Sequence, residues 1–212
     1  MRGLTLIQPW ASAIAMGLKT IETRSWRTPY RGRLLIHAGK KNADPTKPVE
    51  FDCPLGVIVA VADLMDVVPI VDKLPFLGVD ARAEDHTRCA MVDSEFEPCV
   101  RVWTFGVVAG NPCWWSSEGT QDVPWGDFTP GRYAWLLKNT QALLEPLRSY
   151  SCPECQGLGK RAFRLDTRSD RPCQSCNGKG QRQVRGALGL WTASPDLTAA
   201  VMRSDLAVPD PR

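Results

Sequence analysis

Short segments with alternating or continuous apolar residues run through most of the chain, and they have the length of β-strands. Residues 19–26 alternate in the manner of a half-exposed strand. Residues 55–64 (LGVIVAVADL) are almost continuously apolar and rich in β-branched side chains, as in a strand that is buried on both faces. Residues 67–70 are expected to continue this strand past a bulge, and further strands are expected at residues 4–7, 33–38, 100–109, 133–137 and 184–193. The pattern therefore predicts a β-rich fold.

One early helix interrupts this pattern. Residues 11–16 are rich in helix-forming side chains, with Pro9 where a helix can begin and a glycine where it can end. Residues 71–100 are expected to form a loop or a short helix, and residues 111–131 a long loop. Residues 194–212 contain two late prolines and few apolar side chains, so they are expected to be a flexible tail. The predicted fold class is α+β, with more strands than helices.

The composition is that of a globular protein, with 43% hydrophobic and 23% charged residues. A chain of 212 residues can hold one ordinary core and a small additional module. No apolar run approaches the ~20 residues needed to cross a bilayer, and the first residues open directly into a strand pattern. We therefore expect a soluble, cytoplasmic protein with no membrane association.

Charge is distributed unevenly along the chain, although the net charge is only +3. Residues 1–41 hold eight basic residues and one acid, residues 42–149 hold eight basic and sixteen acidic residues, and residues 150–192 hold eight basic and three acidic ones. Clusters of Lys and Arg attract phosphate backbones through counterion release, so the two basic segments point to nucleic acid as a partner. Arg161 and Arg164 would contact phosphate in the second segment. Solubilising surface charge is the alternative explanation.

A repeated CxxCxGxG motif lies in the second basic segment, as CPECQGLG and then CQSCNGKG. Four thiolates satisfy tetrahedral Zn²⁺ and leave no open position, so we expect one structural zinc ion. A redox dithiol is the alternative. His86 with Cys89, Cys99 and Cys113 could in principle build a second metal site, but their spacing follows no ligand pattern, so these three thiols are expected to be free and buried. The predicted zinc ligands are Cys152, Cys155, Cys173 and Cys176.

The chain resembles the ASCH (activating signal cointegrator homology) family of the PUA-like superfamily. The shared motifs are QPWA at 8–11, GLKTIETRSW at 17–26, YRG to IHA within 30–38, GVIV to DL within 56–64, GRYAW at 131–135, and RG to GLW within 185–191. The resemblance implies a small β-barrel with a cleft beside the early helix that binds RNA, DNA or a modified base. The cysteine repeats are similar to those of the DnaJ-type zinc finger, with two repeats present instead of four.

Some members of the resembled family are hydrolases, including nucleoside amidohydrolases and ribonucleases. In the amidohydrolases a Lys and a Thr three residues later carry catalysis, together with a distant Glu. Lys19 matches that Lys, whereas Glu22 stands at the Thr position, so the nucleophile of that group is missing. Lys19 and Glu22 are the candidate catalytic residues of an enzyme with this fold, a nuclease or a nucleobase or nucleoside hydrolase.

Residues of the first basic segment could form a nucleic-acid-binding cleft. Glu22 and Arg24 share one strand face and could pair, which would place a forked donor beside an acceptor for reading a base edge. An internal ion pair that closes the barrel is the alternative. Trp10 and Trp26 could stack on a base or pack in the core. His37 ends an apolar strand and is expected to be a hydrogen-bonded core histidine rather than a general base. The expected nucleic-acid-binding residues are Trp10, Lys19, Glu22, Arg24, Trp26 and Arg31.

Taken together, these features predict a nucleic-acid-binding module on a PUA-like ASCH β-barrel. Residues 1–193 would form this domain, with residues 184–193 as its closing strand and residues 150–183 as a zinc-finger insertion. An enzyme that uses Lys19 and Glu22 is one alternative. A protein-interaction adaptor that docks through the finger is another.

Overall fold

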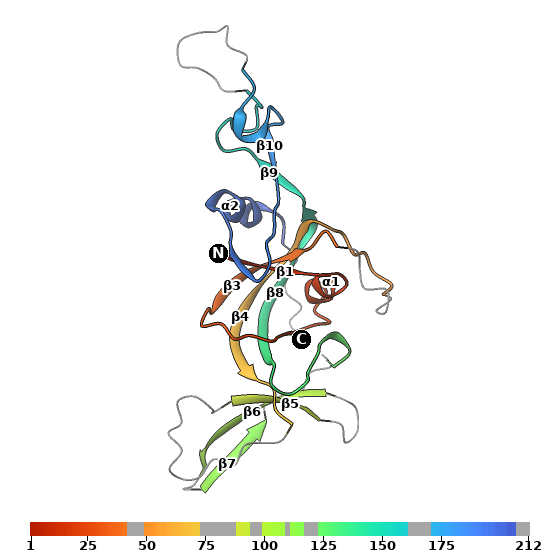
Figure 1. Ribbon diagram of the computed structural model, residues 1–212, viewed down its shortest axis with the longest axis vertical. Helices are drawn as coiled ribbons and strands as arrows, with labels where there is room; N and C mark the ends of the chain where they lie inside the picture. Colours follow the sequence, from red (N-terminus) through yellow and green to blue (C-terminus); the bar gives the residue numbers. More distant parts are fainter. Residues whose placement is uncertain are drawn as a thin grey trace. The chain divides into compact units, whose positions relative to one another are not determined.

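A computed structural model of the chain describes residues 1–41, 49–72, 88–93, 99–108, 111–116, 123–160 and 171–206 (Figure 1). Its strands are β1 (Arg2–Leu6), β2 (Ile21–Arg24), β3 (Gly32–Ala38), β4 (Val57–Pro69), β5 (Arg88–Asp93), β6 (Cys99–Val108), β7 (Asn111–Ser116), β8 (Tyr133–Leu147), β9 (Ser149–Ser151), β10 (Gln181–Gln183) and β11 (Leu190–Thr192). The helical segments are α1 (Trp10–Ala15), η1 (Val123–Trp125), η2 (Gln174–Cys176) and α2 (Pro195–Arg203).

The largest element is a curled six-stranded sheet with the order β11-β1-β3-β4-β8-β2. β1 pairs in parallel with β3, so that Leu4 lies opposite Ile36, and its other edge pairs antiparallel with β11. β2 pairs antiparallel with β8, with Glu22 opposite Trp135. This strand-rich half-barrel with few helices confirms the predicted β-rich fold class. Neither of the α-helices that the structure describes is long and apolar enough to cross a membrane.

The chain divides into two compact units, and β4 and β8 contribute residues to both. The first unit contains residues 1–15, 33–62 and 140–212, and the second contains residues 16–32 and 63–139. The first unit has its own apolar cluster, drawn from β3, β4, β8, α2 and the segment around β11. It consists of Leu35, Ile58, Val61, Leu143, Val184, Ala193, Leu197 and Val201.

The buried amide of Gln8 fixes the start of α1 in the first unit. Its Oε1 accepts a hydrogen bond from the Ser12 N–H at 3.0 Å, and its Nε2 donates to Ser12 Oγ at 2.8 Å and to the Pro54 carbonyl at 2.9 Å. Both polar ends of the amide are therefore satisfied inside the protein, as burial of a polar group requires.

The segment after β11 is helical, so the prediction of a flexible tail is wrong for residues 195–203. Ser194 caps α2, because its side chain accepts a hydrogen bond from the Leu197 N–H at 3.2 Å, and Pro195 occupies the first turn. Leu197 and Val201, four residues apart, are buried on one helix face in the apolar cluster. The Ser-Pro start and this spacing are the signals in the sequence that indicate a helix.

The predicted closing strand at 184–193 is shorter in the structure. Only Leu190–Thr192 pairs with β1, while Leu188 is 97% exposed and Gly189 has a φ of +68°. Val184 is buried, and its N–H donates to the Arg148 carbonyl at 2.9 Å. The segment therefore reaches the sheet through an irregular connection before it becomes a strand.

The second unit contains β2 and a cluster of Ile21, Val68, Ile70, Phe128 and Ala134. It also contains a three-stranded antiparallel sheet in the order β5-β6-β7. β5 and β7 fall in segments that were predicted to be loops, so those two predictions are wrong there. Their residues form strands through pairing with β6, the only one of the three with a strong strand pattern of its own.

β4 runs to Pro69, so residues 67–70 continue the strand at 55–64 as expected, without an interruption in the assigned strand. β8 is longer than predicted, because it continues to Leu147 instead of ending near Leu137. Asn139 lies inside this longer strand. Its φ of 49° is a left-handed conformation that Asn tolerates well. The polar stretch around it suggests a turn in the sequence, whereas the structure accommodates it inside a continuous strand.

Candidate functional site

The four cysteines of the repeat converge on one point. Their sulfur atoms all lie within 4.8 Å of one another, and all four side chains are buried. The Sγ–Sγ distance is 3.9 Å between Cys152 and Cys173 and 3.7 Å between Cys155 and Cys176. Tetrahedral coordination with Zn–S bonds of about 2.3 Å separates thiolates by about 3.8 Å. The cluster therefore has the size and the donor set for one tetrahedral metal ion.

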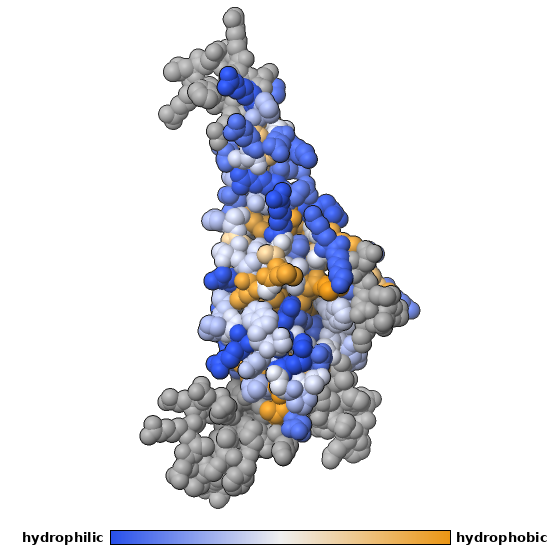
Figure 2. All heavy atoms as spheres, in the orientation of Figure 1, coloured by the Kyte–Doolittle hydropathy of each residue, from blue (hydrophilic) through white to orange (hydrophobic). Residues whose placement is uncertain are grey.

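Residues 149–160 and 171–183, which we call the cysteine module, have almost no apolar interior. The buried cluster in the module consists of the four cysteines alone, and Leu158 is 73% exposed. On the face shown in Figure 2, hydrophilic residues cover this part of the molecule. Because the module lacks a hydrophobic core, a metal ion at the thiolates is the interaction that would hold it folded.

The two motifs are related by an approximate twofold repeat of their backbone hydrogen bonds. The N–H of Cys152 donates to the Gly180 carbonyl at 2.8 Å, and the N–H of Cys173 donates to the Gly159 carbonyl at 2.8 Å. Each motif also closes a turn on its own first cysteine, from the glycine five residues later. The duplicated sequence thus builds two equivalent halves that bond to each other.

The last glycine of each motif points its N–H at a sulfur. Gly159 donates to Cys155 Sγ at 3.3 Å, and Gly180 donates to Cys176 Sγ at 3.2 Å. Their φ angles of +73° and +71° favour glycine. A Cβ on Gly180 would also meet the backbone carbonyl of Gly157. These two glycines would orient the thiolates toward a bound metal ion from outside the ligand set.

The thiols are not equivalent in acidity. Burial opposes ionisation of Cys152, but backbone hydrogen bonds from Cys155 and Glu154 outweigh it and lower its pKa to about 7. Burial raises the pKa of Cys176 to about 11, against the hydrogen bond from the Gly180 N–H. Since metals bind the thiolate form, metal binding at neutral pH releases protons from this cluster.

Lys19 is buried in the second unit, and all three of its ammonium hydrogens have acceptors. Nζ lies 2.6 Å from the Ile21 carbonyl, 2.7 Å from the Trp125 carbonyl and 3.3 Å from Glu22 Oε2, and the side chain is 0% exposed. In a regular strand over residues 19–26, Lys19 and Glu22 would lie on opposite faces. Because Lys19 precedes the strand, its side chain is free to turn and reach that carboxylate.

The predicted pair of Glu22 and Arg24 is formed. Arg24 Nε lies 3.0 Å from Glu22 Oε1, so the carboxylate is held between two cations, and the Arg24 side chain is 23% exposed. Trp26 follows at 36% exposure, with its ring edge-on to Trp135 at a centroid distance of 4.7 Å and an interplanar angle of 89°. The structure therefore brings Lys19, Glu22 and Arg24 into one chain of ionic contacts in the second unit, with Trp26 two residues beyond it.

Arg31 and Trp10, also predicted to bind nucleic acid, have different surroundings. Arg31 pairs with Asp66 at 3.0 Å and donates to the backbone carbonyls of Thr28 and Tyr30 at 2.9 Å. These contacts give it a role in holding its own loop. Trp10 is the half-buried first residue of α1, in the first unit.

His37 is a core histidine, as the sequence indicated. It is 4% exposed, its Nδ1 lies 3.2 Å from Thr5 Oγ1, and burial followed by the charge of Lys40 lowers its pKa. Thr5 Oγ1 also accepts a hydrogen bond from Trp191 Nε1 at 3.0 Å. A Cβ at Gly186 would collide with this group, so the close approach explains the glycine.

Three other predictions lie outside the described residues, namely those for His86, Arg161 and Arg164, as do the side chains of Cys89, Cys99 and Cys113.

Sequence reasoning missed contacts that join distant segments. The Trp125 carbonyl accepts a hydrogen bond from Lys19, 106 positions away in the sequence. Asp127 forms an ion pair with Arg132 at 3.3 Å, and its N–H donates to Thr23 Oγ1. It also missed a pocket beside the cysteine module to which Arg185 and Trp191 contribute. No local spacing marks these residues, and the basic balance of residues 150–192 is the only sequence signal that hints at the pocket.

Comparison with known proteins gives one family match and two relatives. The sequence model of the ASCH domain matches residues 4–109. Over 79 residues the chain is 40% identical to Activating signal cointegrator 1 of Homo sapiens, and equally to that of Mus musculus. These alignments cover 30% of this chain and 14% of each relative. The four cysteines lie outside the residues that the family match covers.

Proposed function

The chain belongs to the ASCH domain family, and on that premise we propose that it is a nucleic-acid-binding module. One observation carries the proposal: β2 ends at the partly exposed Arg24, the partly exposed Trp26 lies two residues further on, and a buried ionic pair fixes the arginine. This arrangement lies in the most basic segment of the chain.

Lys19 supports the arginine indirectly. The ammonium of Lys19 contacts two backbone carbonyls and Glu22, so no donor is left for a ligand. The role of Lys19 in the proposal is therefore to hold the Glu22 carboxylate in place. The other oxygen of Glu22 forms an ion pair with Arg24. Burial of the Glu22 carboxylate is stable only while both cations pair with it. This set of ionic contacts fixes the direction of the Arg24 side chain.

Arg24 and Trp26 would make the contacts with nucleic acid. A guanidinium anchored through Nε presents a rigid planar fork, which suits the acceptor edge of a base or a phosphate. The Trp26 ring, held edge-on by Trp135, offers a surface on which a base can stack. Together they supply both an edge contact and a face contact.

The same contacts weigh against the enzymatic alternative. A general base or nucleophile must reach its substrate with a free lone pair, whereas the ammonium of Lys19 is fully hydrogen-bonded and Glu22 is 8% exposed. The adaptor alternative is separated by experiment, because an adaptor would bind neither RNA nor DNA.

For the cysteine module we propose a structural Zn²⁺ ion in a fold similar to the DnaJ-type zinc finger. Four buried cysteines whose sulfur atoms lie within 4.8 Å of one another, together with two N–H···S contacts, fit a closed four-thiolate Zn²⁺ site. In this proposal residues 150–183 are an insertion in a domain of residues 1–193. Replacement of residues 151–183 by a short Gly/Ser linker should then leave a folded domain, because Arg148 and Val184 already meet at 2.9 Å.

Binding is tested by fluorescence anisotropy with labelled RNA and DNA oligonucleotides at two salt concentrations. Arg24→Ala should cost about 1–3 kcal/mol and reduce the preference between sequences. Arg27→Ala is the matched control: it removes the same charge from an exposed neighbour, so it should weaken all sequences alike. Wild-type protein that binds no oligonucleotide, or that converts one to product with loss of activity in Glu22→Gln, would overturn the proposal.

A further inference from the structure

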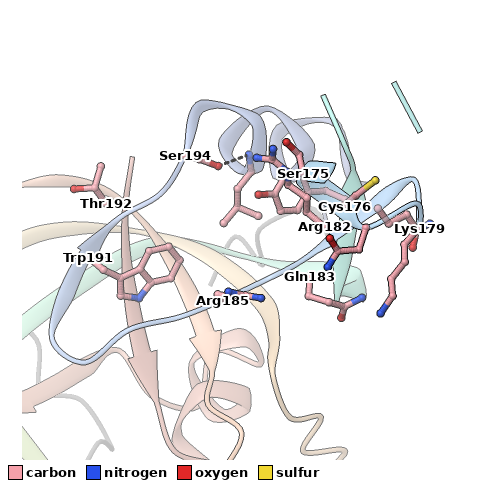
Figure 3. A pocket seen from close by; sticks show the side chains of 13 residues that line it. Ser175, Cys176, Lys179, Arg182, Gln183, Arg185, Trp191, Thr192 and Ser194 are labelled. Atoms are coloured by element: carbon pink, nitrogen blue, oxygen red, sulfur yellow. Dashed lines mark hydrogen bonds between the residues drawn. The ribbon is translucent and has the colours of Figure 1, made fainter. Parts of the chain in front are cut away.

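A pocket of about 500 Å³ lies between the cysteine module and the segment formed by β11 and the start of α2, all within the first unit (Figure 3). Its lining includes three cations, Lys179, Arg182 and Arg185, and two aromatic rings, Tyr150 and Trp191. Among the residues that the structure describes, no Asp or Glu lines it. From this lining we infer that the pocket binds single-stranded nucleic acid, at a site separate from Arg24 and Trp26.

Two of the three cations carry charge that no described acid offsets. Arg182 is paired with Glu154 at 3.2 Å, so it belongs mainly to the internal structure of the module. Lys179 and Arg185 are both exposed, and no ion pair between either of them and a described acid is present. Two exposed cations at the rim of one pocket are suited to adjacent phosphates of a single strand.

Trp191 is held rigidly in the wall of this pocket. Its ring packs against the backbone of Gly3, where a Cβ would collide with it, and its Nε1 donates to Thr5 Oγ1 at 3.0 Å. The ring also lies edge-on to His37, at a centroid distance of 6.2 Å and an angle of 87°. An indole fixed on several sides loses little conformational entropy when a ligand stacks on it. Figure 3 shows Trp191 on the sheet side and Lys179 on the module side, with Arg185 between them in that view.

The shape of the site selects single strands over duplexes. A base can lie against a recessed aromatic ring only when it is unstacked from its neighbours, which single-stranded RNA and DNA allow. A volume of about 500 Å³ suits one or two nucleotides. Polar side chains such as Gln183 and Asn177 in the lining offer hydrogen bonds to a base edge. The inference deepens the proposed function, because it assigns a second surface and a strand preference to nucleic-acid binding.

The first test compares variants of the full, metal-loaded chain by anisotropy, using oligonucleotides of about 12 nucleotides as single-stranded RNA, single-stranded DNA and duplex DNA. Arg185→Ala and Lys179→Ala should each weaken single-strand binding several-fold and reduce the slope of log K against log salt by about 0.7. Arg203→Ala removes the same charge from an exposed position outside the pocket and should leave the slope unchanged. Wild-type slopes in both pocket variants, or tighter binding of the duplex, would overturn the inference.

The second test locates the contact without a substitution. Oligonucleotides that carry 4-thiouridine or 5-iododeoxyuridine are photo-cross-linked to the wild-type protein, and the linked peptides are identified by mass spectrometry. Cross-links at Tyr150 or Trp191 are expected, and cross-links confined to the segment of Trp26 contradict the inference. If Arg24→Ala loses binding and Arg185→Ala does not, the proposed function stands and the pocket is excluded as a binding site. If Arg185→Ala loses binding and Arg24→Ala does not, the surface at Arg24 and Trp26 is excluded and the pocket remains the binding site.

Discussion

Gly180 gives the sharpest test of the metal site proposed for the cysteine module. Its φ is +71°, its N–H donates to Cys176 Sγ at 3.2 Å, and a Cβ on it would meet the Gly157 carbonyl. In Gly180→Ala the left-handed backbone costs about 1–2 kcal/mol. Displacement of the N–H from a thiolate costs about 1.5–3 kcal/mol more. If the module folds around a zinc ion as proposed, the total of about 2.5–5 kcal/mol should appear as a loss of zinc affinity of about seventyfold or more.

Gly189→Ala is the matched control for this substitution. Gly189 has nearly the same φ, +68°, but no atom lies within 4 Å of the position of its Cβ. It should therefore lose about 1–2 kcal/mol of stability and keep its zinc affinity. The assay is a competition titration against a chromophoric chelator at fixed pH, with urea unfolding in parallel. Zinc affinity in Gly180→Ala within about threefold of wild type, or an equal loss in both variants, would refute the reasoning.

Three further outcomes are expected. Lys19→Met leaves Glu22 buried with one of its two cations removed, and it should lower the free energy of unfolding in urea by about 3–5 kcal/mol. Arg27→Ala should change that free energy by less than about 0.5 kcal/mol. Similar values for both variants would contradict the ionic contacts of Lys19 and Arg24 with Glu22. Since burial lowers the pKa of His37, the unfolded chain binds more protons below pH 6.5. Stability should therefore fall on acidification through that range, and the fall should be shallower in His37→Gln. A strong chelator should expose the four ligand cysteines to a thiol reagent while the far-UV signal of the sheet persists; unreactive cysteines after metal removal would show that the module folds without metal.

The cluster of four cysteines could be predicted from the sequence because its determinants are local. Each pair of cysteines lies in one turn, and each glycine that supports a sulfur follows its cysteine by four residues. The pair of Glu22 and Arg24 was predictable for the same reason, since positions i and i+2 share a strand face. The carbonyl partner of Lys19, in contrast, comes from Trp125, and nothing in the strand pattern of residues 19–26 indicates a contact with that segment.

The elements that were missed depend on partners elsewhere in the chain. β7 contains a proline and is only six residues long, and it is a strand because β6 pairs with it. The sequence of α2 contains few apolar residues. It is helical because Leu197 and Val201 pack in the apolar cluster to which β3, β4 and β8 contribute. The pocket beside the module is the extreme case. Its walls come from three segments, so only the folded chain brings Lys179 and Trp191 to one cavity.

The junction of Arg148 with Val184 has a consequence for the stability of the sheet itself. The strand that follows Val184 can pair with β1 only after the chain between these two residues has closed on itself. Closing a flexible loop of that length costs about 3 kcal/mol of chain entropy, from (3/2)RT ln n. A metal ion bound by the four cysteines would cross-link this loop close to the residues where it begins and ends. The ligands would be Cys152, Cys155, Cys173 and Cys176. Such a cross-link would lower the loss of chain entropy when β11 pairs with β1. This entropic cost would therefore be smaller in metal-loaded protein than in metal-free protein.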